Sequence, residues 1–352
     1  MKQELISFLK ADCDKSLAGK QELLNDLRNK SVLVTGGTGF VGKWIAEAIS
    51  LLNEEHFFNI KLYILARNTE DFKEEVPHLA NKPFITLLES DVRNISQLPN
   101  DVNFIINAAG SPDSREHITN PLKTLDILYK GTFALLDACL RLPNLTKVLH
   151  ISSGNIYGQF TGKVDKIKEN QLGSFDCNSV NATYSEGKRL SETLCSIYRN
   201  QQKLPIVIVR PFSFIGPYQG LEKPWAINNF IRDGLLGGPI RILGNEETVR
   251  SYLYGSDMAF WLLSALANGK TGAVYNIGGE EPISLKSLAT KIKASFTQKI
   301  EILFKYSKQY PATPSILIPD TTAIKTDLCV DQIINFDLAL EKTIYWYKQL
   351  NK

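Results

Sequence analysis

The stretch that decides the fold reads TGGTGFVG over residues 35–42. It follows a short apolar segment, Ser31 to Thr35, which we predict to be a strand. It precedes an amphipathic segment, Lys43 to Leu52, which we predict to be a helix. Glycines in such a turn let backbone N–H groups approach a phosphate, because no Cβ stands in the way, and the helix start adds partial positive charge. The spacing fits both G-x-G-x-x-G and G-x-x-G-x-x-G, which predicts a phosphate-binding turn; a tight strand–helix turn without a ligand is the alternative.

A tyrosine and a lysine four residues apart form a second signal. Tyr184 and Lys188 open a proline-free segment, Tyr184 to Asn200, that has the composition of a helix. Residues i and i+4 share one face of a helix, so we expect the Lys188 ammonium to lie beside the Tyr184 phenol and to lower its pKa. Tyr184 would then be a general acid or base for interconverting a carbinol and a carbonyl. The alternative is a surface pair on a solvated helix.

Hydroxyl side chains follow another predicted strand. The apolar segment Lys147 to Ser152 ends in Ser152 and Ser153, with Gly154 next. Ligands of an open α/β sheet bind at the C-terminal ends of its strands, so Ser153 can supply a hydroxyl to the oxygen that Tyr184 protonates. We interpret His150, inside this strand, as a core histidine.

Strands and helices alternate along the first two thirds of the chain, which predicts a parallel, doubly wound sheet. The predicted strands are Ser31–Thr35, Lys61–Ala66, Ile85–Glu89, Phe104–Asn107, Lys147–Ser152 and Pro205–Arg210, and the longest predicted helices are Leu122–Leu142 and Tyr184–Asn200. We therefore predict a helical extension over residues 1–30, a dinucleotide-binding domain over 31–210 and a smaller substrate-binding lobe over 211–352, with interleaved segments. Two short helices in the extension, Gln3–Leu9 and Gln21–Leu27, should brace the core; contact with a second subunit is the alternative.

Taken in order, the glycine turn, the strand-end serine and the Y-x-x-x-K pair resemble the extended short-chain dehydrogenase/reductase family, and within it the nucleotide-sugar epimerase/dehydratase branch. The resemblance covers the chain from about Lys30 to its last helix. It implies an α/β fold, a Rossmann-type doubly wound sheet with a smaller C-terminal α/β lobe. It also implies that Tyr184 exchanges the substrate proton, that Lys188 tunes it and holds the ribose, and that Ser153 bonds the sugar oxygen.

The resemblance also assigns a site for NAD(P). Its residues would be Gly36, Thr38, Gly39, Phe40, Val41, Arg67, Asp91, Val92, Ala108, Ala109, Tyr184, Lys188 and Pro211. NAD-preferring sites usually carry an acidic residue at the end of the second strand, where this chain has Arg67. An arginine can accommodate a 2′-phosphate, so we favour NADP; the alternative is that Arg67 faces solvent while NAD binds.

The implied substrate is a nucleotide-diphosphate sugar, held by Ser153, Asn155, Asn228, Asn229 and Arg250. The implied chemistry is hydride exchange at sugar C4, as an epimerase or a 4-ketoreductase. A 4,6-dehydratase of this family carries an Asp-Glu pair where this chain has Gly154 and Asn155. Dehydration is therefore the less favoured alternative, and it would need other carboxylates such as Asp113 or Glu116.

Two readings from other classes remain open. The first is a dinucleotide-binding redox sensor or RNA-associated scaffold without turnover, which the retained Ser153, Tyr184 and Lys188 disfavour. The second is oxidation of a lipid or steroid alcohol, which Arg250 disfavours, since a cation suits a diphosphate better than an apolar substrate.

Composition allows this interpretation. The 352 residues are 43% hydrophobic and 22% charged, with a formal net charge of +3, which gives no reason to expect nucleic acid or a membrane as partner. The five cysteines include no C-x-x-C pair and the four histidines are dispersed, so we expect no metal site and a reducing, cytoplasmic location. The two long helices could pair with their copies, so we expect a homodimer.

Overall fold

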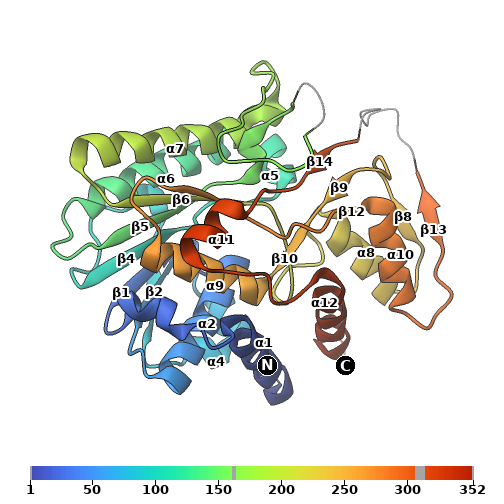
Figure 1. Ribbon diagram of the computed structural model, residues 1–352, viewed down its shortest axis with the longest axis horizontal. Helices are drawn as coiled ribbons and strands as arrows, with labels where there is room; N and C mark the ends of the chain where they lie inside the picture. The colour runs from blue at the N-terminus through green and yellow to red at the C-terminus, as the bar shows by residue number, and fades with distance from the viewer. Residues whose placement is uncertain (1, 161–163, 306–313, 351–352) are drawn as a thin grey trace.

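The computed structural model describes residues 2–160, 164–305 and 314–350, and a seven-stranded parallel sheet lies at its centre (Figure 1). The strand order is β11-β6-β5-β4-β1-β2-β3. Its strands are β1 (Ser31–Thr35), β2 (Lys61–Ala66), β3 (Ile85–Glu89), β4 (Val102–Asn107), β5 (Lys147–Ile151), β6 (Ile206–Pro211) and β11 (Val274–Ile277). The order runs one way from β1 to β3 and the other way from β4 to β6, so the predicted α/β, doubly wound Rossmann-type fold is confirmed.

Each face of this sheet has its own core. Val32 and Val34 of β1 join the cluster that includes α2 (Phe40–His56) and α9 (Gly255–Asn268). Leu33, between them, joins the cluster of α6 (Pro121–Cys139) and α7 (Thr183–Gln202) on the opposite face. Figure 1 shows these two helix layers on either side of the strands. Because both faces are covered, the strands are continuous apolar runs, and the sequence predicts their bounds closely.

Shorter elements complete the described residues. The other helices are α1 (Gln3–Leu17), α3 (Glu70–Glu75), α4 (Pro77–Ala80), α5 (Ser114–Thr119), α8 (Ala226–Leu235), α10 (Leu285–Ala294), α11 (Thr322–Leu328) and α12 (Phe336–Leu350). The 3-10 segments are η1 (Gln21–Leu27), η2 (Val92–Asn94), η3 (Gly154–Tyr157) and η4 (Val180–Ala182). None of the helices in this described part of the chain combines the length and apolar composition that a bilayer crossing requires.

The C-terminal part of the chain forms small sheets beside the main one (Figure 1). In these, β7 (Ser213–Ile215) pairs with β10 (Tyr252–Tyr254), β9 (Val249–Arg250) lies between β12 (Ile283–Ser284) and β14 (Ile316–Leu317), and β8 (Ile240–Ile242) pairs with β13 (Ile302–Phe304). Strand β11 then returns to the main sheet beside β6. The chain therefore crosses between the two lobes, and the domain boundaries at residues 30 and 210 stay predictions.

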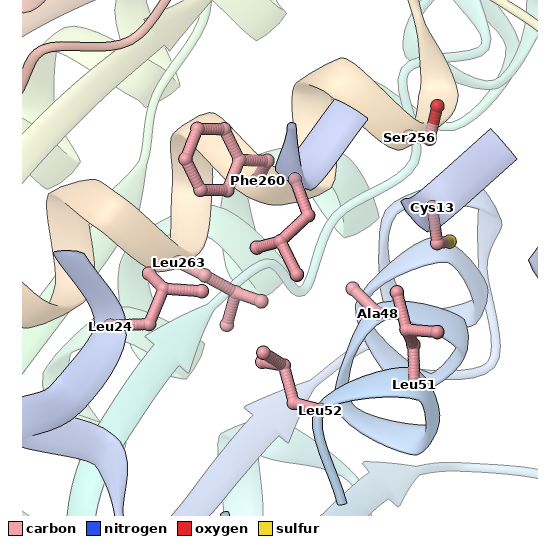
Figure 2. A pocket seen from close by; sticks show the side chains of 9 residues that line it. Cys13, Leu24, Ala48, Leu51, Leu52, Ser256, Phe260 and Leu263 are labelled. Atoms are coloured by element: carbon pink, nitrogen blue, oxygen red, sulfur yellow. The ribbon is translucent and has the colours of Figure 1, made fainter. Parts of the chain in front are cut away.

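The N-terminal segment lies against α2 and α9. Helix α1 runs to Leu17 instead of ending at Leu9 as predicted, and Ala18 closes it in the left-handed conformation. Tyr254 Oη donates a hydrogen bond to Asp12 Oδ2 at 2.6 Å, which ties α1 to β10. Figure 2 shows a small, mostly apolar pocket where this segment meets the core, lined among others by Cys13, Leu24, Ala48, Leu52 and Phe260.

Candidate active site

The glycine turn is locked to the end of β4. Thr35 Oγ1 accepts hydrogen bonds from the backbone N–H groups of Ala108 (3.1 Å) and Ala109 (3.2 Å) and donates to Asn107 Oδ1 (3.0 Å). Gly36 has φ +65°, and a Cβ there would stand 3.0 Å from Ala108 O and from Ala109 Cα. Only glycine therefore fits at position 36, and the ends of β1 and β4 form one rigid edge.

The N-terminus of α2 above this turn is open to solvent at Gly39. Gly39 is exposed, and a Cβ at Gly39 would meet only Gly36 O, at an ordinary 3.4 Å. Helix α2 has 17 residues and starts directly after Gly39 with no side chain capping its N-terminus. Free N–H groups of a long helix that face an open glycine turn are what a dinucleotide phosphate requires. The half-buried Phe40, Val41 and Thr38 flank this position.

Ionic contacts surround Asp91, one of the residues predicted to bind the dinucleotide. Arg93 binds the Asp91 carboxylate through Nε (3.0 Å) and Nη2 (2.7 Å), and its Nη1 reaches Asp126 at 2.7 Å. The Arg93 hydrogen bonds, with a smaller contribution from the Arg67 charge, lower the pKa of Asp91 to about 2. Arg67 is exposed after β2, and Val92 is buried against α6. Asp91 is therefore ionised, with its carboxylate bound to Arg93.

The predicted catalytic residues come together at the end of β5. Ser153 caps η3, with its Oγ accepting from the Asn155 backbone N–H at 3.1 Å. Tyr184, on the first turn of α7, is buried and interacts with the Ser153 hydroxyl. Lys188 is buried one turn later, 5.9 Å from the centre of the Tyr184 ring. A hydroxyl, a phenol and an ammonium thus meet where an open α/β sheet binds its ligands.

The ionisation of this group differs from our expectation. Burial raises the pKa of Tyr184 to about 12, and the Ser153 hydroxyl opposes this only in part. The predicted lowering of this pKa by Lys188 is wrong for the protein without ligands, because Lys188 Nζ donates to the backbone oxygen of Ile151 at 2.7 Å and lies over the phenol ring. Burial also lowers the pKa of Lys188 to about 8. Near neutral pH, Tyr184 therefore holds its proton and Lys188 is mostly charged.

The core interpretation of His150 agrees with its surroundings. Its Nδ1 accepts from Asn107 Nδ2 at 3.1 Å, and the side chain is buried. Burial, together with the nearby Lys188 charge, lowers the pKa of His150 to about 3. His150 is therefore a neutral part of the wall behind Lys188.

The carboxylates that the sequence offered for dehydration are poorly suited to that role in this structure. A Cβ on Gly154 would be 3.1 Å from the Phe212 ring, and Asn155 is exposed. Asp113 accepts two hydrogen bonds from the Arg115 guanidinium (3.1 and 2.7 Å), which lowers the pKa of its carboxyl. Glu116 is exposed to solvent. Asp113 is therefore an ion-paired carboxylate and a poor proton donor, which counts against its predicted use in a dehydratase.

Sequence reasoning missed one residue of this site. His117, on α5, stacks on Tyr184 with ring centroids 4.2 Å apart and ring planes 7° apart. His117 belongs to no sequence motif, and its distance from Tyr184 along the chain gives no sign of the contact. Helix α5 is also too short to show a periodic pattern. Only the tertiary structure brings the two rings together.

The predicted substrate residues lie farther along the chain. Arg250 is half-buried in β9, where Nη1 donates to the backbone oxygens of Val249 (2.8 Å) and Ser315 (3.0 Å), and burial lowers its pKa. It forms no ion pair within residues 2–160, 164–305 and 314–350. Asn228 is buried and donates to Gly220 O at 2.8 Å, whereas Asn229 is half-buried. Asn228 therefore supports its own loop, and no hydrogen bond among the described residues joins these side chains to Tyr184.

Two further observations complete the site. Pro211 is the last residue of β6 and is half-buried, and Phe212 N donates to Ile277 O of β11 at 2.8 Å. Within the described segments, no three histidine, cysteine or acidic side chains are grouped in a way that could hold a metal ion.

Known proteins resemble this chain over most of its length. A family model described as the NAD dependent epimerase/dehydratase family matches residues 32–278. Among curated proteins, UDP-glucuronic acid decarboxylase 1 of Xenopus tropicalis is 26% identical over 328 residues, which cover 93% of this chain and 74% of that protein. The UDP-N-acetyl-alpha-D-glucosaminuronate decarboxylase of Bacillus cytotoxicus is also 26% identical over 328 residues, covering 91% of this chain and 98% of that protein.

A solved structure has the same fold. The UDP-glucuronic acid 4-epimerase of Bacillus cereus, in complex with UDP-glucuronic acid and NAD, matches with a TM-score of 0.77 at 23% identity. The match covers 91% of this chain and 99% of that one. Proteins with this architecture thus include one that binds a nucleotide sugar together with a dinucleotide.

Proposed function

This chain belongs to the NAD dependent epimerase/dehydratase family, and we propose that it exchanges a hydride at C4 of a nucleotide-diphosphate sugar, as an epimerase or a 4-ketoreductase. The observation that carries the proposal is the meeting of Ser153, Tyr184 and Lys188 at the end of β5. The glycine turn between β1 and α2 starts at the same edge of the sheet, because both follow C-terminal strand ends. The dinucleotide at the glycine turn would then exchange the hydride with C4, while Tyr184 exchanges the proton with the oxygen on that carbon.

In this scheme each residue has one task. Tyr184 Oη takes the C4 hydroxyl proton during oxidation and returns it during reduction, and Ser153 Oγ aligns the same oxygen. Lys188 supplies a buried positive charge that favours the phenolate once its hydrogen bond to Ile151 O is exchanged for a ligand. The bound dinucleotide supplies the acceptor or donor of the hydride.

A second candidate is decarboxylation of a nucleotide-linked uronic acid. Two features favour it: the neutral Gly154 and Asn155 do not repel a sugar carboxylate, and the curated relatives above are named as decarboxylases. Oxidation at C4 would precede loss of CO₂, so the same three residues serve both reactions. Dehydration ranks third, because Asp113 is ion-paired and Glu116 is exposed.

The dinucleotide is a second part of the proposal. Arg67 lies exposed after β2, and we keep NADP as the favoured form because no acidic residue ends that strand. The Bacillus cereus epimerase structure contains NAD, which makes NAD the form to compare. The half-buried Arg250, without an ion pair in the described residues, is proposed to bind the substrate diphosphate.

A homodimer is the remaining part of the proposal. Exposed apolar side chains follow the outer faces of α6 and α7: Leu122, Tyr129, Phe133, Leu190 and Ile197. Phe133 packs edge-on against Tyr198 with ring centroids 6.1 Å apart, so the two helices present one continuous surface. A second copy of the chain is the proposed occupant of this surface, in the cytoplasm.

The test is product analysis with purified protein. UDP-glucose and UDP-glucuronic acid are incubated with NAD, and a 4-keto nucleotide sugar is incubated with NADPH. NMR distinguishes C4 inversion, a reduced C4, loss of CO₂ and a 4-keto product. Tyr184→Phe should lower turnover by about 10²-fold or more while leaving dinucleotide affinity within about twofold. If wild type and Tyr184→Phe are equally inactive yet equally able to bind dinucleotide, the non-catalytic sensor or scaffold becomes the better description.

A further inference from the structure

A histidine lies flat on the proposed acid/base, and the catalytic scheme above does not use it. The imidazole of His117 and the phenol of Tyr184 are nearly parallel, with centroids 4.2 Å apart. Both side chains are buried, at 7% and 8% exposure. A ring held face to face at this separation restricts rotation of its partner, so His117 bears on where the Tyr184 hydroxyl points.

His117 is itself fixed. Its Nε2–H donates to Ser111 O at 2.7 Å, which fixes the ring plane and places a proton on Nε2. The helix that carries it, α5, is capped by Asp113, whose carboxylate accepts from the Arg115 backbone N–H at 3.0 Å. Lys223, from the loop before α8, approaches the same carboxylate at 3.8 Å. The N-terminus of the helix that carries His117 is thus held through Asp113 by contacts with Arg115 and Lys223.

Two other contacts of Tyr184 are recorded among the described residues. Ser153 interacts with its hydroxyl, and Lys188 Nζ, bonded to Ile151 O, lies 5.9 Å from the ring centre, which is farther than the stacked imidazole. We propose that His117 is a positioning residue, which holds the Tyr184 ring so that Oη stays aligned with Ser153 and the reacting sugar oxygen. This inference rests on the proposed function, and it adds a residue outside the Ser153, Tyr184 and Lys188 group. Small displacements of a reacting group cost large factors in rate, so the effect should fall on kcat.

Three variants test this role. His117→Leu keeps volume but removes the ring, and His117→Phe restores a flat ring without the N–H donor. Ile118→Ala is the matched control, because Ile118 is the next residue of α5 and is 55% exposed. With whichever nucleotide sugar the wild type converts, we expect His117→Leu to lower kcat by about tenfold with KM unchanged within about twofold. His117→Phe and Ile118→Ala should stay within about threefold of wild type.

A second readout does not depend on turnover. Tyrosines are replaced by 3-fluorotyrosine, and the ¹⁹F resonance of Tyr184 is identified by its loss in Tyr184→Phe. The resonance should move in His117→Leu and stay in place in Ile118→Ala, because only the first removes a ring from the phenol face.

Each outcome decides between the possibilities. Wild-type kcat in His117→Leu, an equal loss in His117→Phe or in Ile118→Ala, or a change confined to KM would overturn the positioning role. If the wild type converts no nucleotide sugar, the proposed function fails, and the ¹⁹F shift decides by itself whether His117 positions Tyr184. An unmoved resonance in His117→Leu then overturns the inference as well.

Discussion

Two alanine substitutions in the glycine turn should separate folding from dinucleotide binding. Gly36 has φ +65°, and a Cβ there would lie 3.0 Å from Ala108 O and Ala109 Cα, which are backbone atoms that cannot swing aside. The left-handed conformation costs a residue with a Cβ about 1–2 kcal/mol, and overpacking adds about 1–3 kcal/mol. Gly36→Ala should therefore lower the free energy of unfolding by about 3 kcal/mol.

Gly39→Ala should behave differently. Gly39 has φ −81°, and its added Cβ would meet only Gly36 O at 3.4 Å. Alanine is a poorer helix N-cap than glycine by up to about 1 kcal/mol, and the loss of chain freedom in the unfolded state offsets about 0.4–1 kcal/mol of this. Stability should stay within about 1 kcal/mol of wild type. The methyl group stands where a phosphate would approach α2, so dinucleotide affinity should fall by about tenfold or more, the value of one hydrogen bond to a charged group.

Thermal unfolding without ligand and calorimetric titration with NAD and NADPH measure the two effects. The expected pattern is a lower melting temperature for Gly36→Ala and a near-normal melting temperature with weak binding for Gly39→Ala. Wild-type affinity in Gly39→Ala would refute the phosphate site above the turn. A wild-type melting temperature in Gly36→Ala would refute the close packing of β1 against the end of β4.

Three further outcomes are expected. Burial raises the pKa of Asp257 to about 6 from 3.8, so the folded state binds the proton more tightly and the wild type loses stability relative to Asp257→Asn as pH rises from about 4 to 6. The difference is on the order of 3 kcal/mol, measured by urea unfolding at several pH values, and a pH-independent difference would contradict it. Arg67→Ala should weaken NADP binding about tenfold more than NAD binding; equal losses would mean that Arg67 faces solvent in the complex. Phe133→Asp should convert a dimer to a monomer in sedimentation velocity, and an unchanged mass would remove the α6/α7 surface from consideration.

Sequence patterns predict the strand bounds and the shared helix face of Tyr184 and Lys188, because both depend on neighbouring residues along the chain. Strands β1 and β2 have the predicted bounds because each is an apolar run buried on both faces between turn residues. Strand β3, at the edge of the sheet and mostly half-buried, also has the predicted bounds. Tyr184 and Lys188 share a helix, so their spacing alone places both on one buried face of α7. The predicted length of helix α1 was too short. Its polar residues Asp12 and Ser16 suggest an exposed segment, but both are buried and form hydrogen bonds with Tyr254 and Ser256.

Ionisation and side-chain partners depend on contacts that the sequence does not display. The spacing that brings Lys188 near Tyr184 does not say that Ile151 O takes the ammonium, and this bond leaves the phenol with a raised pKa. Likewise, the sequence does not show that the Asp113 carboxylate accepts a hydrogen bond from the Arg115 guanidinium. His117 reaches Tyr184 only through the fold, since 67 residues separate them in the chain.

Hydrogen bonds from several separate segments of the chain hold the turn that carries Ser153. Tyr157, at the end of the η3 turn that Ser153 caps, donates to Asn276 Oδ1 of β11 at 2.5 Å and accepts from Arg210 Nη1 of β6 at 3.1 Å. Asn276 also donates to Ile167 O at 2.8 Å, and Arg210 is ion-paired with Glu192 of α7 at 2.8 Å. The turn that presents the serine and the helix that presents the tyrosine are therefore joined through Arg210. Loss of this buried charge would leave Glu192 unpaired and release both residues together, so the alignment of hydroxyl and phenol is a property of the closed network.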